Sequence, residues 1–276
     1  MTENAPAHAA TETGAALLDA VEAHHRRFTA FPDEAAAVAV ALWSAHTHLL
    51  DCFESTPRLA FLSPEPGSGK TRALATIGSL VPRARGVSGT IAAALIRAVS
   101  GPGDRPTVLL DDVDNLARSR SAASEEQRGL INAGHRRTGR VLRCTGVGDD
   151  RSVQAIPVYF ALAIAGTSDL PGPIMSRSIV VRMRRANTSA FESRHPEADG
   201  HALRKRLAAW ADTVRDRLND AWPELPDGIS DRQADVWEPL LAVADAAGGH
   251  WPARARAACV QLVNAAAANS PTCQAR

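Results

Sequence analysis

The 276-residue chain has no long apolar run. No stretch approaches the roughly 18 uninterrupted apolar residues that a membrane-spanning helix needs. The first residues, MTENAPAHAATETG, have neither the basic start nor the apolar core of a signal peptide. The sequence therefore predicts a cytoplasmic protein without a membrane partner, and its 45% apolar content is enough for a sizeable core.

Metal-binding residues are scarce and poorly spaced. The four cysteines, at 52, 144, 259 and 273, form no C-x-x-C pair, which indicates neither a zinc site nor a disulfide framework. We expect them to be reduced. His46 and His48 lie two residues apart, a spacing that points them to different faces of a helix, so they are predicted to be core or surface histidines.

Lysine is almost absent from a chain with little net charge. The formal charge of +1 excludes a composition suited to bulk binding of a polyanion. Of the 31 lysines and arginines, only Lys70 and Lys205 are lysines. A lysine is a compact ammonium that arginine does not replace at a phosphate site, so the position of Lys70 is informative.

The stretch FLSPEPGSGKTRAL, residues 61–74, contains a phosphate-loop pattern. Gly69, Lys70 and Thr71 match the end of G-x-x-x-x-G-K-[ST], with Pro64 at the place of the first glycine. A short apolar run precedes the loop and a helical stretch follows it, which is the context that the motif requires. Pro64 is tolerable because its fixed φ suits a turn at a strand exit.

The loop predicts a nucleotide site with bound Mg²⁺. Gly67 and Gly69 allow backbone N–H groups to turn toward a phosphate at the start of the helix. Lys70 would reach the β- and γ-phosphates of ATP and Thr71 would ligate the metal. The predicted binding residues are Pro66, Gly67, Ser68, Gly69, Lys70, Thr71 and Arg72.

Two acids end a buried apolar run about 40 residues later. In VLLDD, residues 108–112, we assign Asp111 to the metal and Asp112 to polarisation of the attacking water. Asp114 competes for the second role.

Strands that alternate with helices predict a mainly parallel sheet covered on both faces. The expected strands are 58–63, 107–111, 141–145, 152–158, 160–165 and 179–183, with 141–145 and 152–158 forming a hairpin. The expected helices are 34–50, 70–80, 90–99, 125–137, 202–218, 231–247 and 252–268, with another before residue 31. Tryptophans 210, 222, 237 and 251 are predicted to anchor the C-terminal helices to one another.

These elements predict four parts: a disordered segment 1–13, N-terminal helices 14–57, an α/β core 58–186 and a small all-α lid 187–276.

The order of the motifs resembles the AAA+ class of P-loop ATPases. SPEPGSGKT is similar to their first nucleotide motif, VLLDD to the second and AIAGTSDLP to the strand and polar sensor that follow. SRS at 176–178 resembles a box whose arginine reaches the γ-phosphate on a neighbouring subunit. The resemblance implies that Thr167 or Ser168 is the sensor, that Arg177 is the arginine finger, and that the protein forms a homo-oligomer such as a hexameric ring.

A second arginine is implied by the C-terminal part. SDRQADVWEPLLAVADAAG resembles a lid helix whose early arginine, here Arg232, contacts the nucleotide. From FPDEAAAVAVALW to WPARARAA the chain resembles an uncharacterised family of ATPase-like proteins of actinobacteria and phages. Each of these roles has an open alternative. Arg177 could be a surface arginine at a strand start, and Arg232 could pair with Asp235 at the start of a helix. Thr167 or Ser168 could cap a turn.

Five arginines cluster around the predicted hairpin. Phosphate contacts need only positive charge at backbone spacing, so the hairpin could bind DNA without reading its sequence; a solvated arginine face is the alternative. Tyr159 and Phe160 are expected in the core and not as stacking platforms. The five are Arg136, Arg137, Arg140, Arg143 and Arg151.

Together these features predict an oligomeric Mg²⁺-dependent ATPase that remodels or unwinds DNA, as a helicase-like or loader-like factor of phage or mobile-element replication. An ATPase that remodels a protein partner is the second hypothesis, and a monomeric small-molecule kinase is the third.

Overall fold

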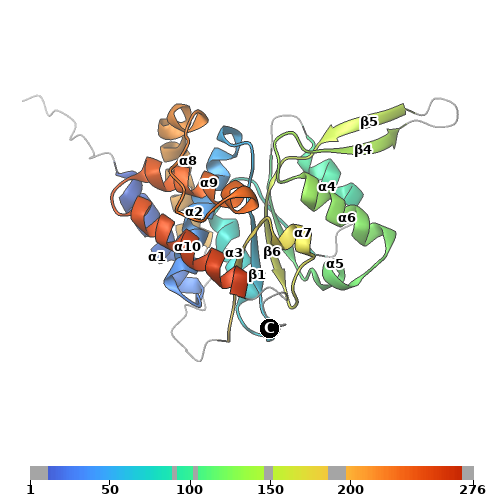
Figure 1. Cartoon of the computed structure of the whole chain (residues 1–276), viewed down its shortest axis with the longest axis horizontal. Coiled ribbons are helices and arrows are strands. Elements are labelled where there is room, and N and C mark those ends of the chain that lie inside the picture. The colour runs from blue at the N-terminus through green and yellow to red at the C-terminus, as the bar shows by residue number, and fades with distance from the viewer. Residues whose placement is uncertain (1–11, 89–91, 102–104, 146–151, 186–196, 269–276) are drawn as a thin grey trace, which may run out of the picture.

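The computed structural model describes residues 12–88, 92–101, 105–145, 152–185 and 197–268. Two helical layers enclose a central sheet, and a two-stranded hairpin extends from one side (Figure 1). The predicted disorder of the N-terminus falls almost wholly outside the described residues, as does Arg151.

The central sheet has five parallel strands in the order β2-β3-β6-β1-β7. The strands are β1 (Arg58–Leu62), β2 (Ala84–Ser88), β3 (Thr107–Asp111), β6 (Ala161–Gly166) and β7 (Ser178–Arg182). The fold is therefore α/β, as predicted. Because all five run in the same direction, their carboxyl ends share one edge of the sheet and their amino ends the other.

The three middle strands are apolar along almost their whole length because both faces of the sheet are covered. Successive side chains point to opposite faces. Leu59 and Phe61 of β1 join the apolar cluster on one face, whereas Ala60 and Leu62 join the cluster on the other.

The larger helical layer combines segments from both ends of the chain. The layer consists of α1 (Gly14–Phe28), α2 (Glu34–His46), the 3₁₀ helix η1 (Thr47–Cys52), α3 (Lys70–Leu80), α8 (Glu197–Asn219), α9 (Asp231–Ala247) and α10 (Trp251–Ala268). Side-chain oxygens of Thr13 and Asp33 cap the first two helices. The segments predicted as N-terminal helices and as lid thus share one apolar cluster with the sheet.

Shorter helices cover the opposite face: α4 (Ala92–Val99), α5 (Asp114–Arg118), α6 (Ala122–Ala133) and α7 (Gly172–Met175). Ser121 caps α6, and apolar side chains of all four helices pack on the sheet. The hairpin β4 (Arg140–Thr145) and β5 (Ser152–Pro157) is antiparallel, as predicted, and projects beyond α4 and α6 (Figure 1).

Some expectations differ from the structure. The sequence does not predict strand β2, because ARGVS has no apolar alternation and forms the outermost strand of the sheet. The helices α5 and α7 are too short to show a periodic pattern. The α-helix predicted over 34–50 ends at His46 and continues as η1. The prediction that Trp222 anchors the C-terminal helices is wrong, because Trp222 is 85% exposed. Trp237 and Trp251 are buried. Among the described residues no helix is long and apolar enough to cross a membrane.

Candidate functional site

Three loops meet at the carboxyl edge of the sheet. The loop after β1 follows Leu62, which is paired with Gly166 at the end of β6. Ser63 donates its N–H to the carbonyl of Gly166 at 3.2 Å, and Val113, after β3, donates to the carbonyl of Ala165 at 3.3 Å. The strand order thus brings the predicted phosphate loop, acids and sensor to one place, the usual ligand crevice of open α/β sheets.

The end of β6 is tightly packed at Gly166. A side chain at Gly166 would meet Val113 Cγ2 at 3.0 Å and Leu62 Cδ2 at 3.6 Å. A side chain at position 166 would therefore require Val113 to shift, so glycine eases the close approach of the three loops.

The predicted phosphate loop has a left-handed backbone at two glycines. Gly67 has φ of 73° and Gly69 has φ of 87°, and Gly69 is the N-cap of α3. Left-handed φ values are strained for other residues, which explains glycine at both positions. The open side of the loop lies at Gly67, where an added Cβ would meet nothing within 4 Å. A loop with such turns that leads into a helix N-terminus directs N–H groups at an anion.

Lys70 lies across this loop. Its ammonium donates to the carbonyls of Ser63 at 3.0 Å and Glu65 at 3.1 Å, and to Ser68 Oγ at 3.0 Å. The charge is therefore held inside the loop while the side chain remains half-buried. Thr71, Arg72 and Pro66 are exposed around it.

The acids after β3 have unequal environments. Asp111 Oδ1 accepts the N–H of Asp112 at 3.0 Å, and Asp112 is exposed with φ of 55°. The carboxylate of Asp114 accepts the hydroxyl of Thr167 at 2.6 Å and its N–H at 2.9 Å. The hydroxyl contact, with smaller effects of Arg118 and Lys70, holds the pKa of Asp114 below its ordinary value. Asp114 is thus the acid that is fixed beside the lysine.

The two predicted sensor residues also differ. Thr167 is occupied by Asp114, whereas the buried hydroxyl oxygen of Ser168 has no hydrogen-bond partner among the described residues. A buried hydroxyl without a partner is costly unless a ligand or water satisfies it. This difference favours Ser168 as the group that is left for a ligand.

The donor chemistry of this edge suits a nucleotide with Mg²⁺. The hydroxyl of Thr71 and the carboxylate of Asp111 are hard oxygen ligands, which Mg²⁺ prefers. In the described part of the chain no group of three or more His, Cys, Asp or Glu is placed to hold a metal. A site with few carboxylates fits an ion whose remaining ligands are phosphate oxygens and water. The glycine loop, Lys70 and the orphaned Ser168 hydroxyl fit the phosphates.

The two predicted nucleotide arginines lie at the other edge of the sheet. Arg177 precedes β7, and its carbonyl accepts the N–H of Arg58, the first residue of β1. The five residues of β1 separate this end from the Lys70 loop by about 16 Å. Arg232, in the first turn of α9, lines the same cavity as Arg177. The structure therefore brings Arg177 and Arg232 together but brings neither to the Lys70 loop of the same chain.

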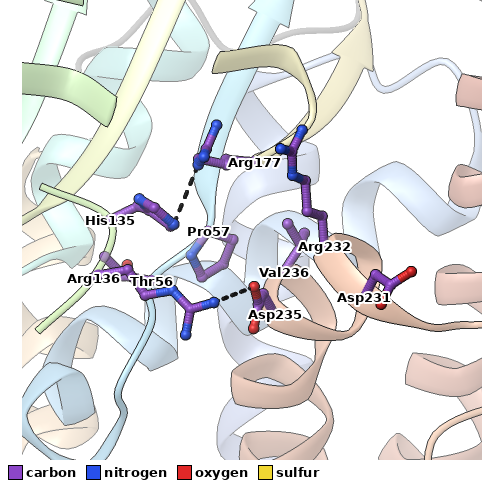
Figure 2. A pocket seen from close by; sticks show the side chains of 9 residues that line it. All are labelled: Thr56, Pro57, His135, Arg136, Arg177, Asp231, Arg232, Asp235 and Val236. Carbon is purple, nitrogen blue, oxygen red and sulfur yellow. Dashed lines mark hydrogen bonds and ion pairs between the residues drawn. The ribbon is translucent and has the colours of Figure 1, made fainter. Parts of the chain in front are cut away.

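The cavity has a volume of about 340 Å³. In Figure 2 the side chains of Arg177 and Arg232 come from two elements, the segment before β7 and helix α9. The lining residues are Thr56, Pro57, His135, Arg136, Arg177, Asp231, Arg232, Asp235 and Val236.

Charge in the cavity is only partly compensated. Arg136 forms an ion pair with Asp235, so the predicted alternative pairing of Arg232 with Asp235 does not occur. In the described residues neither Arg177 nor Arg232 has a carboxylate within ion-pair distance. Partial burial, together with Arg232 and Arg136, lowers the pKa of Arg177, whereas Asp235 acts in the opposite direction. An anion that entered between the two arginines would remove this repulsion.

His135 was not singled out from the sequence. Its Nε2 accepts the Nε–H of Arg177 at 3.2 Å and its Nδ1 donates to the carbonyl of Asn132 at 2.6 Å. Burial and the nearby Arg58, Arg177 and Arg136 lower the pKa of His135 to about 4. The HRR sequence gave no sign of this contact, because Arg177 is 42 residues away along the chain.

Of the predicted DNA-binding arginines, four lie in the described residues, and three of these are held in ion pairs. Arg136 and Arg137 lie before the hairpin and pair with Asp235 and Glu54, while Arg143 on β4 pairs with Glu126. Arg140 is exposed at the base of the hairpin. Tyr159 and Phe160 are buried, as predicted.

One face of the hairpin is apolar and exposed. Leu142 opposes Ala155 and Cys144 opposes Val153 in the antiparallel register, so all four side chains share a face. Leu142 is 71% and Val153 is 68% exposed.

The two histidines predicted to lie in the core or on the surface are both hydrogen-bonded. His46 is buried and His48 is partly buried.

Comparisons with known proteins give partial matches. Residues 180–276, from β7 to the C-terminus, match a family described as "Protein of unknown function (DUF3631)". Over 68 residues the chain is 54% identical to the "Uncharacterized 28.9 kDa protein in xis 5'region" of Saccharopolyspora erythraea. That match spans 25% of each protein.

A solved structure is similar over most of the chain. The full-length MCM homolog of Methanopyrus kandleri superimposes with a TM-score of 0.49 at 15% identity, over 96% of this chain and 62% of the archaeal one. Each relative thus extends beyond the part that this chain matches. The α/β assignment rests on the strand order and register of the chain itself.

Proposed function

We propose that the chain is a Mg²⁺-dependent ATPase of the AAA+ type whose active site is completed by a second copy. The observation that carries the proposal is the Lys70 ammonium held by three oxygens of a glycine-turned loop at the start of α3. A lysine so placed can exchange loop oxygens for phosphate oxygens without leaving the loop. In the phosphate-loop motif the lysine at this position is the group that reaches the β- and γ-phosphates, which supports the proposal.

The proposed reaction uses residues from the carboxyl edge of the sheet. Water attacks the γ-phosphorus, the bond to the bridging oxygen breaks, and ADP and inorganic phosphate leave. Asp112 accepts the proton of the water, and Asp114 is the alternative acceptor. Thr71 and Asp111 would hold Mg²⁺, which would supply positive charge against the phosphate oxygens. Ser168, or Thr167 after it releases Asp114, contacts the γ-phosphate.

We assign Arg177 and Arg232 to the nucleotide on a neighbouring copy. Both guanidinium groups lie at the amino edge of the sheet, about 16 Å or more from the Lys70 loop of their own chain. A guanidinium that enters from outside stabilises the charge that develops on the transferred phosphoryl group. The proposal therefore requires a homo-oligomer, for which a hexameric ring is one form.

The test of hydrolysis compares the only two lysines of the chain. Lys70→Ala should abolish Mg²⁺-dependent release of phosphate from ATP, because the loop loses its ammonium. Lys205→Ala, on the exposed surface of α8, should retain wild-type activity. Equal activity of the two variants would contradict the nucleotide site.

The test of shared sites mixes two inactive variants. Lys70→Ala chains keep Arg177, and Arg177→Ala chains keep Lys70, so mixed oligomers contain some complete sites. Activity should reappear on mixing and should be absent from each variant alone. A monomeric protein without recovery on mixing would contradict action in trans and would leave the small-molecule kinase as the hypothesis to pursue.

The work coupled to hydrolysis is proposed to be DNA remodelling or unwinding in phage or mobile-element replication. The support is the motif resemblance and the exposed Arg140 on the hairpin. The measurement is ATP hydrolysis with and without single- and double-stranded DNA at two salt concentrations. Stimulation should fall as salt rises, since phosphate contacts release counterions. Absence of stimulation and of salt-sensitive binding would exclude DNA as the partner.

A protein partner is the second candidate, and the hairpin surface favours it. Three of the four described arginines in the predicted patch are held in ion pairs, whereas Leu142 and Val153 are exposed. Exposed apolar residues that share one face suit contact with another protein. Stimulation of hydrolysis by a protein, with indifference to DNA, would support this candidate.

A further inference from the structure

The contact between His135 and Arg177 carries a further inference, which rests on the proposed function. His135 lies outside every motif of the chain, yet among the described residues its ring makes the one side-chain hydrogen bond to Arg177. The other partner of Arg177 is the carbonyl of Pro173, which accepts from Nη1.

We propose that His135 is a positioning residue that orients the Arg177 guanidinium toward the nucleotide of a neighbouring copy. Arg177 Nε–H is fixed by His135 Nε2 and Nη1 is fixed by Pro173. The Nη2 group is left without a hydrogen-bond partner in the described residues. Two fixed nitrogens define the plane of the fork and therefore the direction in which Nη2 donates.

The tautomer of His135 is set by its second contact. Nδ1 lies 2.6 Å from the carbonyl of Asn132, which can only accept, so Nδ1 carries the proton. In a neutral imidazole Nε2 is then an acceptor, which is what a guanidinium N–H needs. Burial beside Arg58, Arg136 and Arg177 keeps the ring neutral.

The backbone of His135 is anchored on both sides. Its carbonyl accepts the N–H of Thr56 at 2.9 Å, and the next residue, Arg136, forms a β-bridge with Ser55 and an ion pair with Asp235 of α9. Figure 2 shows the His135–Arg177 hydrogen bond and the Arg136–Asp235 ion pair in the cavity. His135 and its neighbour Arg136 thus connect Arg177 to α9, the helix that carries Arg232.

Two substitutions separate the roles of the two ring nitrogens. His135→Gln retains an acceptor at the place of Nε2, and His135→Asn retains only a donor at the place of Nδ1. The Asn variant should lose about 10- to 100-fold in kcat with little change in KM, because the finger is misplaced and nucleotide binding on the Lys70 loop is untouched. The Gln variant should retain most of the activity.

A double-substitution cycle tests whether the effect passes through Arg177. In an Arg177→Ala background, His135→Asn should cause no further loss of kcat, since no guanidinium remains to be positioned. His250→Asn serves as the control, because His250 is exposed and pairs with Asp19 far from the cavity along the fold. Thermal unfolding of each variant separates loss of kcat from loss of fold.

The outcomes distinguish this inference from the proposed function. A wild-type chain that hydrolyses ATP and depends on Arg177, with equal kcat for the Asn and Gln variants, overturns the positioning role alone. A further loss from His135→Asn in the Arg177→Ala background overturns it as well. A wild-type chain that hydrolyses no ATP overturns the proposed function, and the positioning role with it.

Discussion

Thr167 gives both its N–H and its hydroxyl to the carboxylate of Asp114, at 2.9 and 2.6 Å. The contact joins the end of β6 to the first turn of α5 at the edge where the Lys70 loop lies. Of the two acids that follow β3, Asp114 is therefore fixed by the protein, while Asp112 remains exposed and available.

The two acids should respond differently to loss of charge. Asp112→Asn should lower kcat for ATP by about 100-fold or more with nucleotide binding retained, because it removes the proton acceptor. Asp114→Asn should instead lower the free energy of unfolding by about 1–2 kcal/mol, because it weakens two hydrogen bonds. Single-turnover hydrolysis and denaturant unfolding measure the two effects. The opposite pattern would assign the water to Asp114.

Removal of the Ser168 hydroxyl should cost activity and no stability. The oxygen is buried without a partner among the described residues, so Ser168→Ala removes an unsatisfied group and should leave the melting temperature unchanged or higher. Thr167→Val breaks the contact with Asp114 and should lower the melting temperature. If turnover falls in Thr167→Val and is unchanged in Ser168→Ala, Thr167 is the sensor.

Two buried histidines should make the fold sensitive to mild acid. Burial lowers the pKa of His25 and of His46 to about 3, against an ordinary value near 6.5. Between these values the unfolded chain binds a proton that the folded chain excludes, so their contribution is complete above pH 6.5 and is lost as pH falls toward 3. Each of the two histidines should lower the free energy of unfolding by about 1 kcal/mol for every pH unit of acidification in this window.

Urea unfolding at pH 7, 6 and 5 measures this slope. His46→Gln can still hydrogen-bond to the Thr56 hydroxyl and should reduce the slope, whereas the exposed His250→Gln should leave it nearly unchanged. Equal stability at pH 7 and pH 5 would show that the two rings are not excluded from protonation.

Arg58 should be required for the fold although no carboxylate among the described residues pairs with it. Its guanidinium is fully buried, donates to the carbonyls of Phe160 and Ile131, and has its pKa lowered to about 9 by burial. Arg58→Ala should cost about 3 kcal/mol or more, since it leaves a cavity and two unsatisfied carbonyls. Arg85→Ala on the exposed side of β2 should change stability by less than about 0.5 kcal/mol.

The apolar hairpin face should matter for a partner and not for the fold. Leu142→Ser with Val153→Ser should leave the melting temperature unchanged, because both side chains are largely exposed. The same pair should reduce stimulation by a protein partner. Arg140→Ala is the matched change for DNA, and it should reduce salt-sensitive DNA binding. A fall in the melting temperature of the double variant would show that the face packs within the chain.

Much of the core was predictable because its signals are local. RLAFL, TVLLD and ALAIAG are apolar runs bounded by turn residues, and the GSGKT sequence marks where α3 begins. The ARGVS strand was not predictable, since its pairing with β3 comes from the backbone and its side chains are mostly exposed.

The arrangement of the arginines required the structure. Sequence resemblance implied a nucleotide contact for Arg232, but only the packing of α9 shows that it lies beside Arg177. In the same way the arginines at 136–151 are a cluster in sequence, but Arg136 pairs with Asp235 and Arg137 with Glu54, which are 99 and 83 residues away along the chain. Long-range pairing of this kind leaves no local pattern.

The placement of Lys70 and Arg177 at opposite ends of β1 determines the geometry of any assembly that joins them. A contact that brings Arg177 of each copy to the Lys70 loop of the next copy, repeated in one direction, runs head to tail. In a closed ring every chain then has a complete site. In an open filament the Lys70 loop of the chain at one end and the Arg177 of the chain at the other end remain unmatched, so activity per chain would rise with filament length. Once a ring has closed, activity per chain would be independent of protein concentration.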